Sequence, residues 1–226
     1  MTSYLLLPGA GGTAWYWGRV AALLEKARHT AVAVEFPGDD PGSGLPEYAK
    51  CAIAVAPAGP ITVVAQSMGG FTAPFLWQAL PVERVVFVNA MIPNPGERPG
   101  EWWGNVGSSE AREAAARAGG YSEEFDIWTY FLHDVPDDVA KEGEPYQRPE
   151  ADRAFADVCD FAQRPIIPVH VVAGADDRFF PAAFQQRVAI ERLGIEADVL
   201  QGGHLIALSQ PEAVAAYLTK LDALSS

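Results

Sequence analysis

Ser67 lies between an apolar stretch and a helical pattern, a context in which a serine can act as a nucleophile. Residues 61–65 are apolar apart from one threonine, and residues 69–79 carry apolar side chains at helical spacing. A sharp turn from strand to helix holds a serine in a strained conformation, and it requires small flanking residues. Ala65 and Gly69 meet that requirement. The sequence therefore predicts that Ser67 is a catalytic nucleophile.

A serine hydroxyl needs a base to remove its proton, and the chain contains four histidines. His204 follows residues 202–203, Gly-Gly, between the last predicted strand and the last predicted helix. It is expected at the same edge of the sheet as Ser67. The other three lie after the first predicted helix, in a proline- and acid-rich stretch, and inside an apolar strand; they are His29, His133 and His170. We therefore expect His204 to be the general base.

Two neighbouring aspartates compete to orient this histidine. Asp176 and Asp177 follow the predicted strand at residues 169–173 after Gly174 and Ala175, so the chain order is serine, acid, histidine. A carboxylate bonded to an imidazole fixes its tautomer and stabilises the imidazolium that forms during attack. We favour Asp177 and keep Asp176 as the alternative; the other aspartate then has a turn or cap role.

Residues 8–12, Pro-Gly-Ala-Gly-Gly, follow the first predicted strand and could contribute to an oxyanion hole. Because their side chains are small, a backbone N–H of this glycine-rich loop can meet the N–H of Met68 at the developing negative charge. A phosphate-binding loop is the alternative. It is disfavoured because the G-x-G-x-x-G pattern fails at Ala14 and no P-loop lysine follows.

Short apolar runs alternate with stretches of helical periodicity. The predicted strands occupy residues 4–7, 31–36, 61–65, 85–88, 169–173 and 197–200, and the predicted helices occupy residues 17–27, 45–56, 69–79, 184–193 and 211–224. This alternation implies right-handed crossovers and a mainly parallel sheet with helices on both faces. The fold class is α/β, and residues 1–226 are expected to form a single domain.

The alternation stops at about residues 93–165, which we call the insertion. It holds 16 acidic and 7 basic residues, by count along the printed sequence, together with scattered aromatics. An aromatic inner face and an acidic outer face suit a lid, with pocket residues drawn from Trp102, Trp103, Trp128 and Phe131. The alternative is a solvated excursion whose aromatic residues pack on the core. Within it, we expect residues 133–134, His-Asp, to form a surface turn rather than to contact substrate.

Composition and charge exclude several classes of protein. Hydrophobic residues make up 49% and charged residues 20% of the 226 residues, which is typical of a globular protein. The net charge of −13 has the wrong sign for binding nucleic acid or anionic lipid. The N-terminus has no basic region and Pro8 interrupts its apolar run, so we expect no signal peptide, no membrane span and a cytoplasmic location. Cys51 and Cys159 lack metal-ligand spacing and are expected to be buried thiols.

Taken together, these motifs resemble those of α/β-hydrolase-fold serine hydrolases. The resemblance covers nearly the whole chain, and the stretches that carry it are residues 8–15, 65–70, 174–177, 180–181, 184–185 and 203–204. More narrowly, residues 8–15 and the run from 180 to 185 resemble the small branch that contains plant methylesterases and hydroxynitrile lyases.

The resemblance implies a role for each residue. Ser67, Asp177 and His204 would form the catalytic triad, and the N–H groups of Ala10 and Met68 would form the oxyanion hole. The spacing from Asp177 to residues 184–185 also matches the branch better than the spacing from the neighbouring aspartate.

Two departures separate this chain from the lyases that it resembles. Those lyases carry a threonine in the oxyanion loop and a lysine after the catalytic histidine, where this chain has Gly9 and Leu205. Without that ammonium, a lyase lacks an obvious partner for its leaving anion, so ester hydrolysis is favoured. Ser67 also argues against the related dehalogenases and epoxide hydrolases, which have an aspartate at its position.

The sequence thus predicts a serine carboxylesterase that acts on a small or medium apolar ester through an acyl-enzyme. Its partner is a small-molecule substrate, and the chemistry requires no cofactor and no metal. Two alternatives remain: the same triad used for lactone opening or lyase chemistry, and a non-enzymatic small-ligand binder on the same fold. The oligomeric state is left open.

Overall fold

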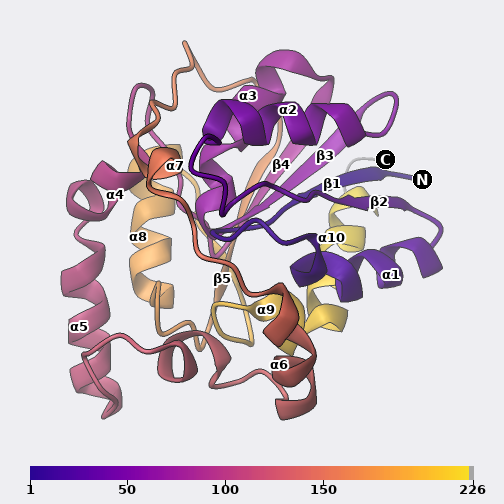
Figure 1. Cartoon of the computed structure of the whole chain (residues 1–226). Coiled ribbons are helices and arrows are strands. Elements are labelled where there is room, and N and C mark those ends of the chain that lie inside the picture. Colours follow the sequence, from indigo (N-terminus) through magenta and orange to yellow (C-terminus); the bar gives the residue numbers. More distant parts are fainter. Residues whose placement is uncertain (224–226) are drawn as a thin grey trace.

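Six strands form one parallel sheet in the computed structural model, which describes residues 1–223 (Figure 1). Their order is β2-β1-β3-β4-β5-β6, and every neighbouring pair is parallel. The strands are β1 (Ser3–Leu7), β2 (Thr30–Ala33), β3 (Ile61–Gln66), β4 (Val82–Val88), β5 (Val169–Gly174) and β6 (Asp198–Leu200). The predicted parallel sheet is confirmed. Because parallel strands all finish at the same edge, the loops that follow them meet there.

Helices cover both faces of this sheet, as predicted. They are α1 (Gly18–Lys26), α2 (Leu45–Val55), α3 (Ala73–Ala79), α8 (Ala182–Leu193), α9 (Ile206–Ser209) and α10 (Pro211–Ala223), with the short 3₁₀ helix η1 (Ala14–Trp17). Leu5 and Val63 belong to a buried cluster with α2, α3 and α8, whereas Leu6 and Val64 belong to a second cluster with α1, α9 and α10. Alternate residues of one strand therefore build two separate cores. Residue 224, the predicted end of the last helix, lies outside the described residues.

Two predicted elements end or begin differently because backbone segments approach each other closely. Strand β2 stops at Ala33 rather than at residue 36, because the Phe36 N–H bonds to the Gly12 carbonyl at 2.8 Å instead of continuing the ladder. The helix expected from residue 69 begins as a 3₁₀ turn, η2 (Ser67–Phe71). There, a Cβ on Gly70 would collide with the carbonyl of Met91. In both places only glycine leaves enough room.

The insertion contains several short helices between β4 and β5. These are α4 (Pro99–Val106), α5 (Ser108–Gly119), the π-helical turn η3 (Trp128–Leu132), α6 (Asp137–Gly143), the 3₁₀ turn η4 (Glu144–Tyr146) and α7 (Asp152–Ala156). In Figure 1, α4, α5 and α6 lie on the left and lower sides of the view, away from the two termini. An antiparallel bridge between Glu97 and Cys159 joins the two ends of this stretch. The whole insertion thus leaves and returns to the sheet at one place.

Glu97 also forms a buried ion pair at the place where the two ends of the insertion meet. Its carboxylate receives two hydrogen bonds from the guanidinium of Arg192, of which the NH2–Oε1 bond is 2.8 Å long, and the two side chains are only 5% and 6% exposed. Burial by itself raises the pKa of Glu97, but the hydrogen bonds from Arg192 and Asn105 outweigh it and the pKa lies below its ordinary value. The ionised pair therefore holds the insertion to α8.

We expect Glu97→Ala to lower the free energy of unfolding by about 3–5 kcal/mol, because it leaves a buried guanidinium uncompensated. Urea denaturation at pH 7 would measure it. Since the folded-state pKa of Glu97 is depressed, the stabilisation is present above the ordinary value of 4.5 and is lost as the pH falls below it. The exposed pair of Arg98 and Glu101 serves as the control, and Glu101→Ala should cost under about 1 kcal/mol. Equal losses in the two variants would contradict the prediction.

The two cysteines differ in their surroundings. Cys159 is fully buried, and its Sγ donates to the Phe71 carbonyl at 3.3 Å; burial raises the pKa of this thiol. Cys51, on α2, is only half-buried, so the prediction of two buried thiols is wrong for this residue. Within residues 1–223, every helix is too short or too polar to cross a membrane.

Candidate active site

Ser67 occupies the turn between β3 and α3 with a backbone φ of +49°, a left-handed conformation that is unusual for a residue with a side chain. The surrounding structure enforces this strain. The Ser67 carbonyl accepts a hydrogen bond from the Met91 N–H at 2.9 Å, and a Cβ on Gly69 would strike the carbonyl of Pro8. Strand β3 is buried along its whole length, which fixes the direction from which the chain enters the turn. Ser67 is thus held as a nucleophile elbow requires.

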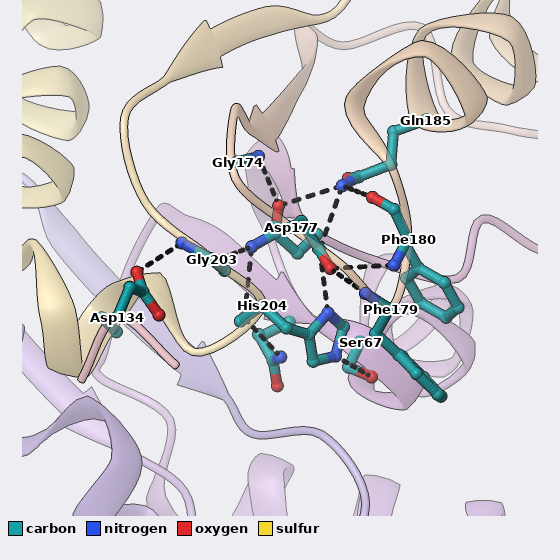
Figure 2. Close-up of polar contacts among 12 residues, drawn as sticks. Ser67, Asp134, Gly174, Asp177, Phe179, Phe180, Gln185, Gly203 and His204 are labelled. Atoms are coloured by element: carbon teal, nitrogen blue, oxygen red, sulfur yellow. Dashed lines mark hydrogen bonds and ion pairs between the residues drawn. The ribbon is translucent and has the colours of Figure 1, made fainter. Parts of the chain in front are cut away.

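His204 and Asp177 complete a chain of hydrogen bonds with Ser67 (Figure 2). His204 Nε2 lies 3.2 Å from Ser67 Oγ, and His204 Nδ1 lies 2.9 Å from Asp177 Oδ2. Ser67 follows β3, Asp177 follows β5 and His204 follows β6, so all three lie at the same edge of the sheet. Ser67 is 9% exposed and His204 is 1% exposed. The histidine can therefore exchange a proton with the serine in a site that is almost closed to water.

Asp177 is oriented by hydrogen bonds to both of its oxygens. Oδ1 accepts from the N–H groups of Phe179 and Phe180, each at 2.8 Å, and Oδ2 accepts from Gln185 Nε2 at 3.2 Å as well as facing His204. These contacts leave the carboxylate little freedom to rotate. The neighbouring Asp176 is exposed, and its Oδ2 accepts from the Gly202 N–H at 3.3 Å. The structure therefore places Asp177, and not Asp176, against the histidine.

Asn89 connects the loops that carry these residues, and the sequence analysis missed it. It follows β4 with a φ of +46°, and its Nδ2 donates to the carbonyls of Gly203 at 2.9 Å and of His204 at 3.1 Å. Its Oδ1 accepts from the Gly174 N–H at 2.7 Å and from Gln185 Nε2 at 3.2 Å. A polar residue directly after the apolar residues 85–88, at the edge where the site lies, was the available signal.

The glycine-rich loop passes directly against Ser67. A Cβ on Gly9 would lie 2.5 Å from Gln66 Oε1 and 2.8 Å from the Cβ of Ser67. The Gly9 carbonyl accepts from the Gly12 N–H at 3.1 Å, and all peptide bonds in the described part of the chain are trans. The Ala10 N–H belongs to the same peptide unit as that carbonyl and must point the opposite way. Met68, in the first turn of η2, also has an N–H without a helical partner.

A cavity of ≈ 440 Å³ opens on the side of the site formed by the glycine-rich loop. Most of its wall is apolar, and its residues include Gly9, Ala10, Tyr16, Phe131 and Leu205. The ring of Phe131 stacks on the imidazole of His204, with a centroid separation of 4.9 Å and an interplanar angle of 18°. Of the four aromatic residues expected in a pocket, Phe131 alone lines this cavity among residues 1–223.

The other three predicted pocket residues lie elsewhere. Trp102 is fully buried in the core, where its Nε1 donates to the Ile92 carbonyl at 3.1 Å and its ring lies 5.2 Å from that of Phe180. Trp103 packs beside it against Phe179, with centroids 5.6 Å apart. Trp128 is 61% exposed. The buried indole of Trp102 and the half-buried indole of Trp103 fill space between the insertion and α8, so their aromatic character reflects packing rather than a pocket.

Residues 133–134 form a turn and do not line the cavity, as expected, but both are half-buried and Asp134 is hydrogen-bonded. Asp134 Oδ2 accepts from the Gly203 N–H at 2.6 Å, as Figure 2 shows, directly before His204. Burial, followed by the charge of Arg178, lowers the pKa of His133. This pair thus connects the insertion to the loop of the histidine. Among residues 1–223, no group of three or more His, Cys, Asp or Glu side chains is arranged to hold a metal ion.

Known proteins share this fold and part of this sequence. A rice protein named "Probable esterase PIR7A" (Oryza sativa) is 31% identical over 111 residues, which span 43% of this chain and 42% of the rice protein, so the match covers less than half of either. The solved structure of the methylesterase MES16 from Arabidopsis has a TM-score of 0.77 at 18% identity, with 99% of this chain and 100% of that chain covered.

A pyrethroid hydrolase from Sphingobium faniae JZ-2 has a TM-score of 0.76 at 21% identity, with 97% of this chain and 96% of that chain covered. At such identities the two structures establish the common fold. The family model described as "Alpha/beta hydrolase family" matches residues 4–217, which is nearly the whole sequence. The chain therefore belongs to the alpha/beta hydrolase family.

Proposed function

We propose that this protein is a serine carboxylesterase with Ser67, His204 and Asp177 as its catalytic triad. The observation that carries the proposal is the pair of contacts at His204, 3.2 Å from Ser67 Oγ and 2.9 Å from Asp177 Oδ2, at a serine with left-handed φ. The names of its relatives support ester chemistry, since two of them are called an esterase and a methylesterase.

In the proposed acylation step, His204 Nε2 takes the proton of Ser67 as Oγ attacks the ester carbonyl carbon. The carbonyl oxygen becomes an oxyanion and accepts hydrogen bonds from the N–H groups of Ala10 and Met68. Collapse of this intermediate breaks the bond to the alcohol, which leaves with the proton from His204. Asp177 stabilises the imidazolium throughout.

In the proposed deacylation step, a water molecule takes the place of the alcohol. His204 removes its proton, the resulting hydroxide attacks the acyl carbon, and the carboxylic acid leaves as Ser67 recovers its proton. The cavity of ≈ 440 Å³ and its apolar wall suit a small or medium apolar ester. The acidic insertion disfavours polyanionic substrates at the entrance.

Intact-mass analysis after treatment with a fluorophosphonate tests the proposal. An activated serine forms a stable phosphonyl adduct, so we expect one adduct on the wild-type protein and none on Ser67→Ala. Ser209→Ala is the matched control, because Ser209 lies in α9 outside the site, and it should retain the adduct. Turnover of p-nitrophenyl acetate should be lost together with the adduct. Absence of an adduct on the wild-type protein would favour a ligand-binding role instead.

A further inference from the structure

Residues 148–150, near the end of the insertion, form hydrogen bonds with the glycine-rich loop at Gly11. Glu150 Oε2 accepts from the Gly11 N–H at 2.6 Å, and Arg148 Nε donates to the Gly11 carbonyl at 3.0 Å. Both polar groups of one loop residue are thus held by residues 148–150, nearly 140 positions further along the chain. Neither contact is needed to build the sheet. The loop that carries Ala10 therefore depends on the insertion for its position.

Glu150 is itself held firmly from another direction. Its Oε1 accepts a short hydrogen bond from the hydroxyl of Tyr48, on α2. The next residue, Ala151, donates its N–H to the Gly38 carbonyl at 2.7 Å. Gly38 also leaves room for the carboxylate, since a Cβ there would lie 3.0 Å from Glu150 Oε2. These contacts hold the Glu150 carboxylate in place, and the carboxylate in turn positions the glycine-rich loop.

The bonded loop admits one orientation for the Ala10 N–H. Gly11 and Gly12 have φ values of +81° and +71°, and glycines allow neighbouring peptide units to flip at little steric cost. The bond from Gly11 N–H to Glu150 fixes the Ala10–Gly11 peptide, and the bond from Gly12 N–H to the Gly9 carbonyl fixes the Gly9–Ala10 peptide. In this arrangement the Ala10 N–H makes no bond within residues 1–223 and remains available.

A half-buried carboxylate is a costly way to fill space. Burial raises the pKa of Glu150, and the hydrogen bonds from Tyr48 and Gly11 and the charge of Arg148 lower it in part, while Asp39 adds a further upward push. An apolar side chain would pack here without desolvating a charge. What it could not do is accept a hydrogen bond from the loop, and a charged acceptor makes that bond strong.

We propose that Glu150 is a positioning residue for the oxyanion hole: by holding the Gly11 N–H, it keeps the N–H of Ala10 directed at the reacting carbonyl oxygen. The inference rests on the proposed esterase function. Glu150 does not touch substrate. It acts through the loop, so its loss should weaken stabilisation of the transition state more than binding of the substrate.

Glu150→Ala and Glu150→Gln test this proposal on the full chain. The amide oxygen of glutamine can still accept from Gly11 while its NH₂ group donates to Tyr48, so Glu150→Gln should retain kcat within about threefold. Glu150→Ala should lower kcat for p-nitrophenyl acetate by about 10- to 100-fold, up to the loss for one oxyanion donor, with KM within about threefold. Glu144→Ala, which removes an exposed carboxylate from the same segment, is the control and should behave as the wild type.

A pair of ketone inhibitors separates positioning from a general loss of structure. A trifluoromethyl ketone adds to Ser67 and places an oxyanion in the hole, whereas the methyl ketone of equal chain length binds without addition. Glu150→Ala should weaken the first by about the same factor as kcat and leave the second within about threefold. An equal effect on both ketones, a kcat within threefold of wild type, or a Glu150→Gln variant as inactive as Glu150→Ala would overturn the proposal.

Two further results keep the test decisive. If Glu150→Ala does not fold, Tyr48→Phe removes only the hydroxyl that fixes the carboxylate, and it should reproduce the selective loss of trifluoromethyl ketone affinity at about threefold or more. Absence of that loss overturns the proposal. Failure of the proposed function looks different, because the wild-type protein would then neither hydrolyse the ester nor form the fluorophosphonate adduct.

Discussion

Asp177→Asn is expected to lower kcat for ester hydrolysis by about 10⁴-fold at neutral pH. The reason lies in which way the new amide must face. The N–H groups of Phe179 and Phe180 both donate to Oδ1, so the oxygen of asparagine takes that position. Its NH₂ group then faces His204 Nδ1, which must accept a hydrogen bond and leave the proton on Nε2. In that tautomer His204 cannot take the proton of Ser67.

Asp176→Asn is the matched control for this prediction. Asp176 is exposed and accepts a single hydrogen bond of 3.3 Å from Gly202, which an asparagine oxygen can replace. Its kcat should stay within about threefold of the wild-type value. Steady-state kinetics on p-nitrophenyl acetate, with thermal unfolding to confirm folding, would measure both variants. A larger loss for Asp176→Asn would assign the role to Asp176, and comparable losses in the two variants would contradict a role specific to Asp177.

The strands, the elbow and the histidine loop were predictable because their signals are local. An apolar run of strand length, a pair of small residues around Ser67 and a Gly-Gly before His204 each specify backbone geometry within a few residues. Once the strands are parallel, the edge at which they finish is fixed, and so is the place where the loops meet. The family match over residues 4–217 agrees with that fold.

The contacts across the insertion were not predictable, because no local pattern encodes them. Whether an indole such as Trp102 enters the core or stays exposed like Trp128 depends on how the helices pack. The hydrogen bonds that Gly203 donates to Asp134 and Gly11 donates to Glu150 join residues 69 and 139 positions apart. In the sequence, Asp134 and Glu150 are indistinguishable from the other acidic residues of an acidic stretch. Such contacts therefore have to be read from the structure.

Gly9→Ala is expected to lower kcat by about 10²- to 10³-fold while the protein stays folded, because the loop must retreat from the nucleophile. The added Cβ would lie 2.5 Å from Gln66 Oε1 and 2.8 Å from the Cβ of Ser67, both closer than van der Waals contact. A movement of Gln66 would cost its bond of 3.4 Å to the His204 carbonyl and would not relieve the clash with the Cβ of Ser67, which the backbone of the turn holds in place. The loop would therefore move, and the Ala10 N–H would lose its place.

Gly18→Ala is the control, because a Cβ at the start of α1 meets no atom within 4 Å and alanine favours the helix. It should leave kcat unchanged and keep or raise the midpoint of thermal unfolding. The trifluoromethyl ketone should lose affinity for Gly9→Ala in proportion to kcat, since both depend on the same N–H group. Full activity in Gly9→Ala would mean that the glycine-rich loop contributes no donor to the oxyanion, and that the N–H of Met68 carries the stabilisation without it.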